Sequence, residues 1–398
     1  MSARGAVSLK DAAARAGVTP RTLKRWAQDG VVPRAARDEG WTDAAVAHAR
    51  VVARLRERGH SLGEIRAATR DGKLAFSYVE DLLPPPQPAY TLEQAAEETG
   101  LEAGLIARIY VAQGFTTGSL EQISEDDLQL LRYIAAVLAA GLPLVALLQL
   151  VRVYGQALAQ VADAEVRLFH LYVHEPLMRN GVPGVEIAEE MEDMVRDLLP
   201  LSSPIMDHLH QRFLAHFLEQ DVIGHMEADL EGELDLGRMR VTIGFADLAG
   251  YTKLTEEAGE EEAVSAVERF LAEVEATLPD EARIIKTIGD GAMIVGSDAG
   301  ALVDWAVGFQ QLQTERPLPR IGLHTGATLY RDGDYFGREV NLASRVAARA
   351  AGGEVIVTRP IVSAAGPHLD FEPIGEVRLK GFSEATELFV ARQADDDD

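Results

Sequence analysis

The sequence of 398 residues contains no cysteine. This absence excludes disulfide bonds and thiolate metal sites, and a reducing, cytoplasmic setting is the simplest expectation. The segment MSARGAVSLK at the start contains no apolar stretch, so we expect no signal peptide. Long uncharged runs are also scarce, and one of them, Tyr133 to Val151, has about the length needed to cross a bilayer. Because Gly141 and Pro143 interrupt this run, we predict a pair of buried helices and no stable membrane insertion.

Basic residues are outnumbered overall, and they are unevenly distributed along the chain. The net charge is −25, yet residues 1–75 contain 15 lysine and arginine residues against 8 aspartate and glutamate residues. A basic N-terminal part on an acidic chain predicts different partners for the two ends.

Proline and charge patterns divide the chain into segments. The sequence PPPQP at 84–88 cannot continue a helix, and a polar acidic stretch follows a long helical region at 227–238. Helical periodicity dominates up to this second boundary, whereas later runs such as 241–245 and 354–358 predict buried strands. We therefore predict an all-α part followed by an α/β part. The predicted segments are a domain at 1–83, a linker at 84–89, a helical domain at 90–228, a linker at 229–238 and an α/β domain at 239–395.

The helical part contains a weak internal repeat. SLKDAAARAGVTPRTL from Ser8 matches TLEQAAEETGLEAGLI from Thr91, and the spacing stays near 82–83 residues in the later matches. The first unit resembles the MerR-type winged helix-turn-helix, with a glycine turn between its two helices. This resemblance implies DNA binding through Arg21, Lys24 and Arg25 on the second helix. The family's wing is abbreviated here to residues 34–41, so a helix-turn-helix retained only for packing is the alternative. The second unit is acidic, and we interpret it as structural.

Histidine is concentrated between positions 170 and 225, where six of the ten histidines lie. His208, His210 and His216 lead directly to the second linker. Because histidine alone titrates near neutrality without perturbation, one hypothesis is that these side chains sense protons. Ordinary surface or packing histidines, or a metal site, are the alternatives, although no cysteine or HExxH motif supports a metal.

Two segments of the α/β part combine carboxylates with turns. Asp247 follows the strand at 241–245, and small residues then open a helix around Gly250, Tyr251 and Thr252. A carboxylate at that position suits a metal-bound polyphosphate, whose oxygens would meet the backbone N–H groups of the helix N-terminus. Further on, two apolar strands meet at a hairpin that contains Asp290. A second carboxylate beside the first would complete a two-metal site, although turn-forming aspartates are the ordinary alternative.

A third segment places an amide and a guanidinium on one helix. The helix is predicted to begin near Gly337, and Asn341 and Arg345 are four residues apart, so they project side by side. Orientation combined with positive charge is what a phosphoryl-transfer transition state requires. A surface polar pair is the alternative for these two residues taken alone.

Together these segments resemble the catalytic pattern of class III nucleotide cyclases. The matching residues are Asp247, Lys286, Asp290, Asp334, Asn341 and Arg345. The resemblance extends over 239–395 and includes GLHTG at 322–326 and LKGF at 379–382. Over about 90–396 the arrangement resembles soluble cyclases of the actinobacterial type, which have a helical N-terminal regulatory domain.

The resemblance implies a ferredoxin-like domain that acts as a homodimer, with active sites between the subunits. Asp247 and Asp290 of one chain would hold two Mg²⁺ or Mn²⁺ ions, and Asn341 and Arg345 of the other would orient the ribose and stabilise the reacting phosphorus. Lys286 and Asp334 would read the base. Lys380 is a weaker candidate for the triphosphate.

The substrate follows from hydrogen bonding, because a lysine donor and an aspartate acceptor complement adenine and not guanine. We therefore predict an adenylate cyclase that converts ATP into cyclic AMP and pyrophosphate and is regulated by its N-terminal helices. A DNA-binding regulator that uses a cyclase-like domain as a nucleotide sensor is the alternative.

Overall fold

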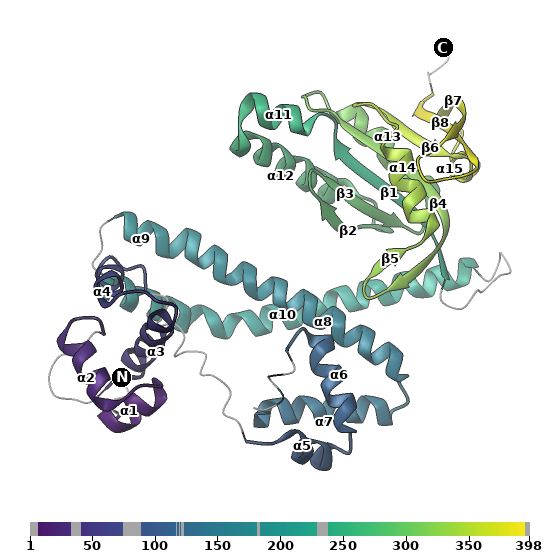
Figure 1. Cartoon of the computed structure of the whole chain (residues 1–398). Helices are drawn as coiled ribbons and strands as arrows, with labels where there is room; N and C mark the ends of the chain where they lie inside the picture. The colour runs from purple at the N-terminus through teal and green to yellow at the C-terminus, as the bar shows by residue number, and fades with distance from the viewer. Residues whose placement is uncertain are drawn as a thin grey trace. The chain divides into compact units, whose positions relative to one another are not determined.

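A computed structural model describes residues 7–32, 41–74, 89–116, 118, 120, 123–180, 184–228 and 238–394. The chain forms two compact units, Met1–Phe213 and Leu214–Asp398 (Figure 1). The division falls within the long helix α10 (Gly184–Ala228). Most of the segment 34–41 and of the predicted linkers 84–89 and 229–238 lies outside the described residues.

The first helical module occupies the N-terminal part of the first unit. It consists of α1 (Leu9–Arg15), α2 (Pro20–Gln28), α3 (Asp43–Glu57) and α4 (Leu62–Arg70). Ser8, Thr19, Thr42 and Ser61 cap these helices, each accepting a hydrogen bond from a backbone N–H of the first turn. Gly17 takes a positive φ of 69° between α1 and α2, which fits the glycine turn expected from the sequence.

A second module repeats the arrangement of the first. It contains α5 (Leu92–Thr99), α6 (Ala103–Gln113), α7 (Glu125–Ala139) and the beginning of α8 (Leu144–Phe169). An antiparallel bridge joins Val7 to Trp41 in the first module, and another joins Tyr90 to Ile123 in the second. Equivalent bridges and separate apolar cores in both modules confirm the internal repeat.

Long helices follow the second module. Helix α8 continues through η3 (His170–His174) into α9 (Glu175–Arg179). The helix pair predicted for Tyr133–Val151 is present as α7 and the beginning of α8, but it is buried only in part: Ile134, Leu147 and Val151 lie in the core of the module, whereas Tyr133 and Val145 are exposed. The stretch Leu144–Arg179 is long and apolar enough to span a membrane by length and composition, and 11% of its most apolar window is buried. Many apolar residues of this stretch lie on an exposed face of the helix, among them Leu158 and Val166.

The second unit contains one mixed sheet with strands in the order β2-β3-β1-β4-β6-β8-β7, and β5 pairs with β4. The strands are β1 (Arg238–Leu248), β2 (Ala282–Ile288), β3 (Gly291–Gly296), β4 (Pro319–Arg331), β5 (Asp334–Phe336), β6 (Val355–Thr358), β7 (Leu369–Arg378) and β8 (Ala385–Gln393). The first four strands pair antiparallel in the order β2-β3-β1-β4. With helices between β1 and β2 and between β3 and β4, this order defines the ferredoxin-like fold that was expected.

Helices cover both faces of this sheet. They are α11 (Tyr251–Ala258), α12 (Glu260–Thr277), α13 (Ala299–Leu312), α14 (Arg338–Ala347) and α15 (Arg359–Ala364). One core lies beneath α12, α13 and α15 and includes Phe270, Trp305 and Ile361. On the opposite face α14 packs against smaller clusters through Ala343 and Leu342. The outcome is a helical region followed by a mixed-sheet domain, as predicted.

One buried histidine makes the first module sensitive to acid. His48 on α3 is 0% exposed, and its Nε2 lies 3.0 Å from the carbonyl oxygen of Val31. Burial lowers the pKa of His48 from 6.5 to about 4, although the hydrogen bond to Val31 opposes this shift. Between these two pH values the unfolded chain binds a proton that the folded module excludes. The free energy of unfolding of this module should therefore be highest above pH 6.5 and should fall as the pH is lowered towards 4.

We expect the free energy of unfolding of this module to fall by up to about 3 kcal/mol over that range. Urea unfolding followed by tryptophan fluorescence measures this, because Trp26 lies in the core of the module. His48→Gln should reduce the pH dependence, whereas His60→Gln, at an exposed position of the same module, should retain it. Equal pH dependence in the wild type and His48→Gln would contradict the assignment.

Candidate active site

Asp247 lies near the end of β1, between two neighbouring strands. The register places it opposite Gly291 of β3 and opposite Arg320 of β4. A Cβ atom at position 291 would lie 2.6 Å from the Cβ of Asp247 and 2.7 Å from the carbonyl oxygen of Ala246. Only glycine therefore allows the hairpin between β2 and β3 to approach this closely.

The close approach brings Asp290, which precedes Gly291 in the hairpin turn, near Asp247. Partial burial raises the pKa of Asp290, and the negative charge of Asp247 raises it further, whereas Arg320 lowers it. Neighbouring carboxylates are the type of oxygen ligand that divalent cations prefer. Among the described residues, no group of three or more His, Asp or Glu side chains is arranged to hold a metal. Asp247 and Asp290 thus offer two carboxylates and do not belong to a larger group of this kind among the residues that the structure describes.

Arg320 is a site residue that the sequence reasoning missed. Its Nε and Nη2 donate to the two carboxylate oxygens of Asp247, the second at 3.0 Å. This bidentate pairing orients the carboxylate of Asp247, whose oxygens, like those of Asp290, are donors of the kind that divalent cations accept. The sequence contained a weak signal for it: a charged residue at the second position of a strand, two residues before the GLHTG segment.

Lys286 and Asp334 come from β2 and β5 and form an ion pair, through Nζ of Lys286 and Oδ2 of Asp334. The second oxygen of Asp334 accepts the backbone N–H of Tyr335 at 2.8 Å, which fixes the carboxylate. Next to this pair, Nη2 of Arg283 donates to the hydroxyl of Tyr335 at 3.2 Å. The two residues predicted to read the base thus lie side by side, although 48 positions separate them in the chain.

Asn341 and Arg345 lie on α14, which begins one residue after Gly337. Both residues are exposed, whereas Leu342, Ala343 and Val346 of the same helix are buried. Within the described part of the chain, their side chains form no hydrogen bond or ion pair. The outer face of α14 therefore presents an amide and a guanidinium, one turn apart, to solvent.

The remaining predicted ligands lie at two turns. Gly250 has a φ of 88° and precedes α11, whose first residues are Tyr251 and Thr252. Tyr251 packs against the core beneath α12, α13 and α15, so it anchors the start of this helix. Lys380 is exposed in the turn between β7 and β8, directly after the buried Leu379.

The residues predicted to serve other functions lie in the helical region and on α10. Arg21, Lys24 and Arg25 are exposed on α2, while Leu23 and Trp26 of the same helix are buried. His208, His210 and His216 are exposed on α10. All six polar side chains are accessible to solvent.

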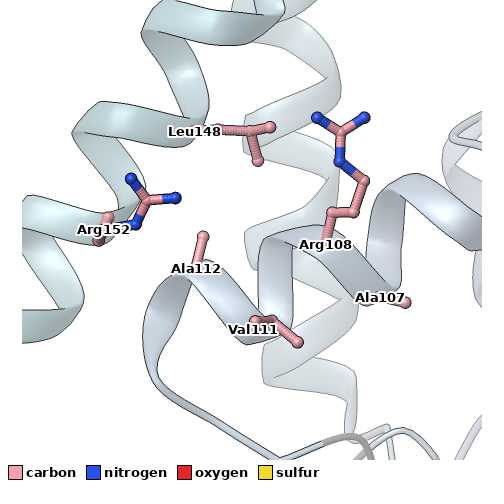
Figure 2. Close-up of a pocket in the computed structure, with 6 residues that line it drawn as sticks. All are labelled: Ala107, Arg108, Val111, Ala112, Leu148 and Arg152. Atoms are coloured by element: carbon pink, nitrogen blue, oxygen red, sulfur yellow. The ribbon is translucent and has the colours of Figure 1, made fainter.

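A separate hollow lies between α6 and α8 in the second module. Its volume is about 370 Å³, and its walls are Ala107, Arg108, Val111, Ala112, Leu148 and Arg152. In Figure 2 the guanidinium groups of Arg108 and Arg152 flank the side chains of Leu148 and Ala112. The lining therefore combines four apolar residues with two arginines, and it contains none of the residues described above.

Comparisons with known proteins identify the two functional regions. A model of the adenylate and guanylate cyclase catalytic domain matches residues 237–392, and a model of the MerR helix-turn-helix regulatory family matches residues 7–71. An adenylate cyclase of Streptomyces coelicolor is 31% identical over 274 residues, covering 67% of this chain and 69% of that protein. A pH-sensitive adenylate cyclase of Mycobacterium tuberculosis is 32% identical over 251 residues, covering 61% of this chain and 62% of that protein.

Among solved structures, the adenylyl cyclase CyaB from P. aeruginosa is 25% identical, with a TM-score of 0.37, covering 41% of this chain and 99% of that chain. The chain belongs to the adenylate and guanylate cyclase family, and its N-terminal module is a MerR-type helix-turn-helix. The family resemblance inferred from the six residues is thereby confirmed.

Proposed function

We propose that this chain converts ATP into 3′,5′-cyclic AMP and pyrophosphate at sites formed between two copies of its catalytic domain. The observation that carries this proposal is the division of the site residues. Asp247 and Asp290 form one charged cluster, whereas Asn341 and Arg345 face outward without a partner among the described residues. A second copy would supply the missing half to each cluster. Related adenylate cyclases support ATP as the substrate.

The surface around Asp334 supports such a dimer. Leu329, Tyr330 and Phe336, on the β4–β5 hairpin, are between 41% and 48% exposed. Neighbouring apolar side chains of this size on a surface are typical of a protein interface. Because the hairpin also carries Asp334, the same surface would bring the base-reading pair to the boundary between subunits.

Asp247 and Asp290 would hold the divalent cations, Mg²⁺ or Mn²⁺, and two ions per site is the number we propose. Bound there, the ions would lower the pKa of the 3′-hydroxyl and neutralise the triphosphate. Arg320, already paired with Asp247, would donate to phosphate oxygens once a cation takes its place beside the carboxylate. The backbone N–H groups at Gly250, Tyr251 and Thr252, together with Lys380, are further proposed phosphate contacts.

The reaction itself is an in-line displacement, in which the 3′-oxygen of ATP attacks the α-phosphorus and pyrophosphate leaves. Asn341 would orient the ribose so that the attacking oxygen lies opposite the leaving group. Arg345 would stabilise the negative charge that develops on the α-phosphoryl oxygens. Lys286 would donate to N1 of adenine, and Asp334 would accept from its amino group.

The division of the site predicts that two inactive variants restore each other. Asp247→Ala and Asn341→Ala should each abolish cyclic AMP formation. After mixing and subunit exchange, half of the dimers contain one intact site, so about a quarter of wild-type turnover should return. Turnover is measured with Mn-ATP and with Mn-GTP side by side, and ATP should be the preferred substrate.

The matched control mixes Asp247→Ala with Asp290→Ala. Both changes affect the same half of the site, so this mixture should stay inactive. The proposal fails if dimeric wild-type protein forms no cyclic AMP, if Asp247→Ala retains full turnover, or if the first mixture recovers nothing.

We also propose that the helical region regulates the catalytic domain. Leu198, Leu201, Ile205 and Leu209 are exposed on α10 at spacings of three and four residues. Such a stripe suits pairing with the same helix of a second copy, which would couple the helices to the catalytic dimer. His208 and His210 lie next to this stripe, and one relative is a pH-sensitive adenylate cyclase. Protonation of these histidines would place positive charges along the paired helices.

This regulation predicts a pH response that depends on three side chains. Replacing His208, His210 and His216 together by glutamine should flatten the activity profile of the full chain between about pH 5.5 and pH 8. His368→Gln, which removes an exposed histidine from the catalytic domain, is the control and should leave the profile unchanged. An unaltered profile in the triple variant would exclude these histidines as sensors.

DNA binding is a second proposed activity, and the match of residues 7–71 to the MerR family supports it. Arg21, Lys24 and Arg25 lie on the exposed face of α2, where they would contact phosphates or base edges in a major groove.

Arg21→Glu combined with Lys24→Glu should weaken retention of genomic DNA fragments in a gel-shift assay by at least about tenfold at low salt. Arg167→Glu, the same type of charge change on α8, should leave retention unchanged. Equal retention by wild type and the double variant would rule out this face.

A further inference from the structure

A buried histidine connects the central sheet to the helix that carries Asn341 and Arg345. His324 of β4 is 6% exposed. Its Nδ1 lies 2.8 Å from Oγ1 of Thr358 at the end of β6, and its Nε2 lies 2.6 Å from Oε2 of Glu339 in the first turn of α14. Three elements therefore meet at one imidazole ring.

The chemistry of the partners fixes the direction of these hydrogen bonds. Burial lowers the pKa of His324, although Glu339 raises it, and this favours a neutral ring that carries one N–H. The carboxylate of Glu339 can only accept, so Nε2–H donates to Glu339 and Nδ1 accepts from the Thr358 hydroxyl. Thr358 is the N-cap residue of α15, yet its side chain makes no capping hydrogen bond. Its hydroxyl is committed to His324.

The backbone of β4 is shaped to receive α14 on this face. Gly322, His324 and Gly326 alternate along the strand and so point to the same side. A Cβ atom at position 326 would lie 2.7 Å from Cγ of Glu339, and one at position 322 would lie 2.1 Å from the backbone nitrogen of Ala347. The two glycines therefore admit the two ends of the helix, and His324 lies between them.

The contact with Glu339 differs in kind from the rest of the helix–sheet interface. Leu342, Ala343 and Val346 attach α14 through apolar contacts, which are not directional and tolerate small shifts. A hydrogen bond of 2.6 Å has a defined distance and angle. Since successive helical residues are about 100° apart, fixing Glu339 also fixes the direction in which Asn341 and Arg345 project.

A threonine, a histidine and a glutamate in a hydrogen-bonded chain also resemble the triad of a hydrolase. Thr358 is 1% exposed, however, and His324 is nearly as inaccessible. No substrate can reach the hydroxyl, so this chain of hydrogen bonds does not supply a nucleophile. Its consequence is structural alignment.

We infer that His324 and Glu339 are positioning residues for cyclisation: they set the placement of α14 on β4 and thereby aim Asn341 and Arg345 at the substrate. This inference rests on the proposed function of α14. Misalignment of a reacting group by about 1 Å can cost on the order of 100-fold in rate. The loss should appear in kcat and not in ATP binding, because the contacts of Asp247, Asp290 and Lys286 lie outside α14.

The test measures kcat and KM of the full chain with Mn-ATP. His324→Ala should lower kcat by about 10- to 100-fold, with KM changed by less than about threefold. Glu339→Ala should reproduce this loss, whereas Glu339→Gln keeps an acceptor oxygen and should recover most of the rate. The Glu339 pair of variants keeps the test decisive if His324→Ala folds poorly.

Two further comparisons separate positioning from a general loss of stability. His368→Ala removes a histidine–carboxylate contact of 2.8 Å to Asp304, elsewhere in the same domain, and should leave kcat unchanged. In a Glu339→Ala background, His324→Ala should lower kcat by less than about threefold further, because the hydrogen bond through which His324 holds α14 is already absent.

Hydrogen exchange of the peptide that contains α14 gives a readout independent of turnover. Exchange should be faster in His324→Ala and Glu339→Ala than in the wild type and His368→Ala. The inference is overturned if α14 exchanges equally in all proteins, if Glu339→Gln is as slow as Glu339→Ala, or if an active wild type and His324→Ala share the same kcat. If the wild type is inactive, the proposed function is refuted. The hydrogen-exchange result would still report on the contact between His324 and Glu339.

Discussion

The register of β1 between β3 and β4 is the constraint on which the candidate site depends. It places Asp247 opposite Gly291 of β3 on one side and opposite Arg320 of β4 on the other. A slip of one residue would turn Asp247 to the other face of the sheet, into the core beneath α12 and α13. The buried alternation of β1 prevents this slip, because Ile243 packs on one face and Ala246 and Leu248 pack on the other.

The same principle extends across the sheet to α14. Gly291 lets the hairpin approach β1, while Gly322 and Gly326 let the helix approach β4. In each case a glycine without a side chain allows the neighbouring element to come close. This close approach determines where the polar residues of that element lie. The close-packed core on the opposite face, which includes Phe270 and Phe309, holds the strands in place and so limits movement at these contacts.

Sequence patterns predicted the parts of the candidate site that depend on residues close together in the chain. Asp247 at a strand end, Asp290 in a hairpin and the pair Asn341 and Arg345 on one helix face follow from periodicity and turn signals. Arg320 and the contact between His324 and Glu339 were missed, because they depend on strand pairing between distant segments. The exposure of α8 was also missed, since composition reports how apolar a helix is and not whether anything covers it.

The two helical modules illustrate the difference between a fold and its surface. Both have an equivalent bridge and a separate apolar core, yet Arg21 and Lys24 of the first correspond to Gly104 and Ala107 of the second. Core positions preserve shape, whereas exposed positions are free to change charge. The repeated architecture thus supports one basic and one acidic surface.

The hairpin between β2 and β3 has a consequence for how the two sites of a dimer communicate. Lys286 and Asp290 are separated by a single tight ribbon, but in the proposed dimer they belong to different sites. In that dimer, a movement of Lys286 on engaging a base would be transmitted through this hairpin to Asp290, the proposed metal-binding carboxylate of the neighbouring site. Occupancy of the two proposed catalytic centres would then be linked, and the response of the enzyme to nucleotide concentration need not be hyperbolic.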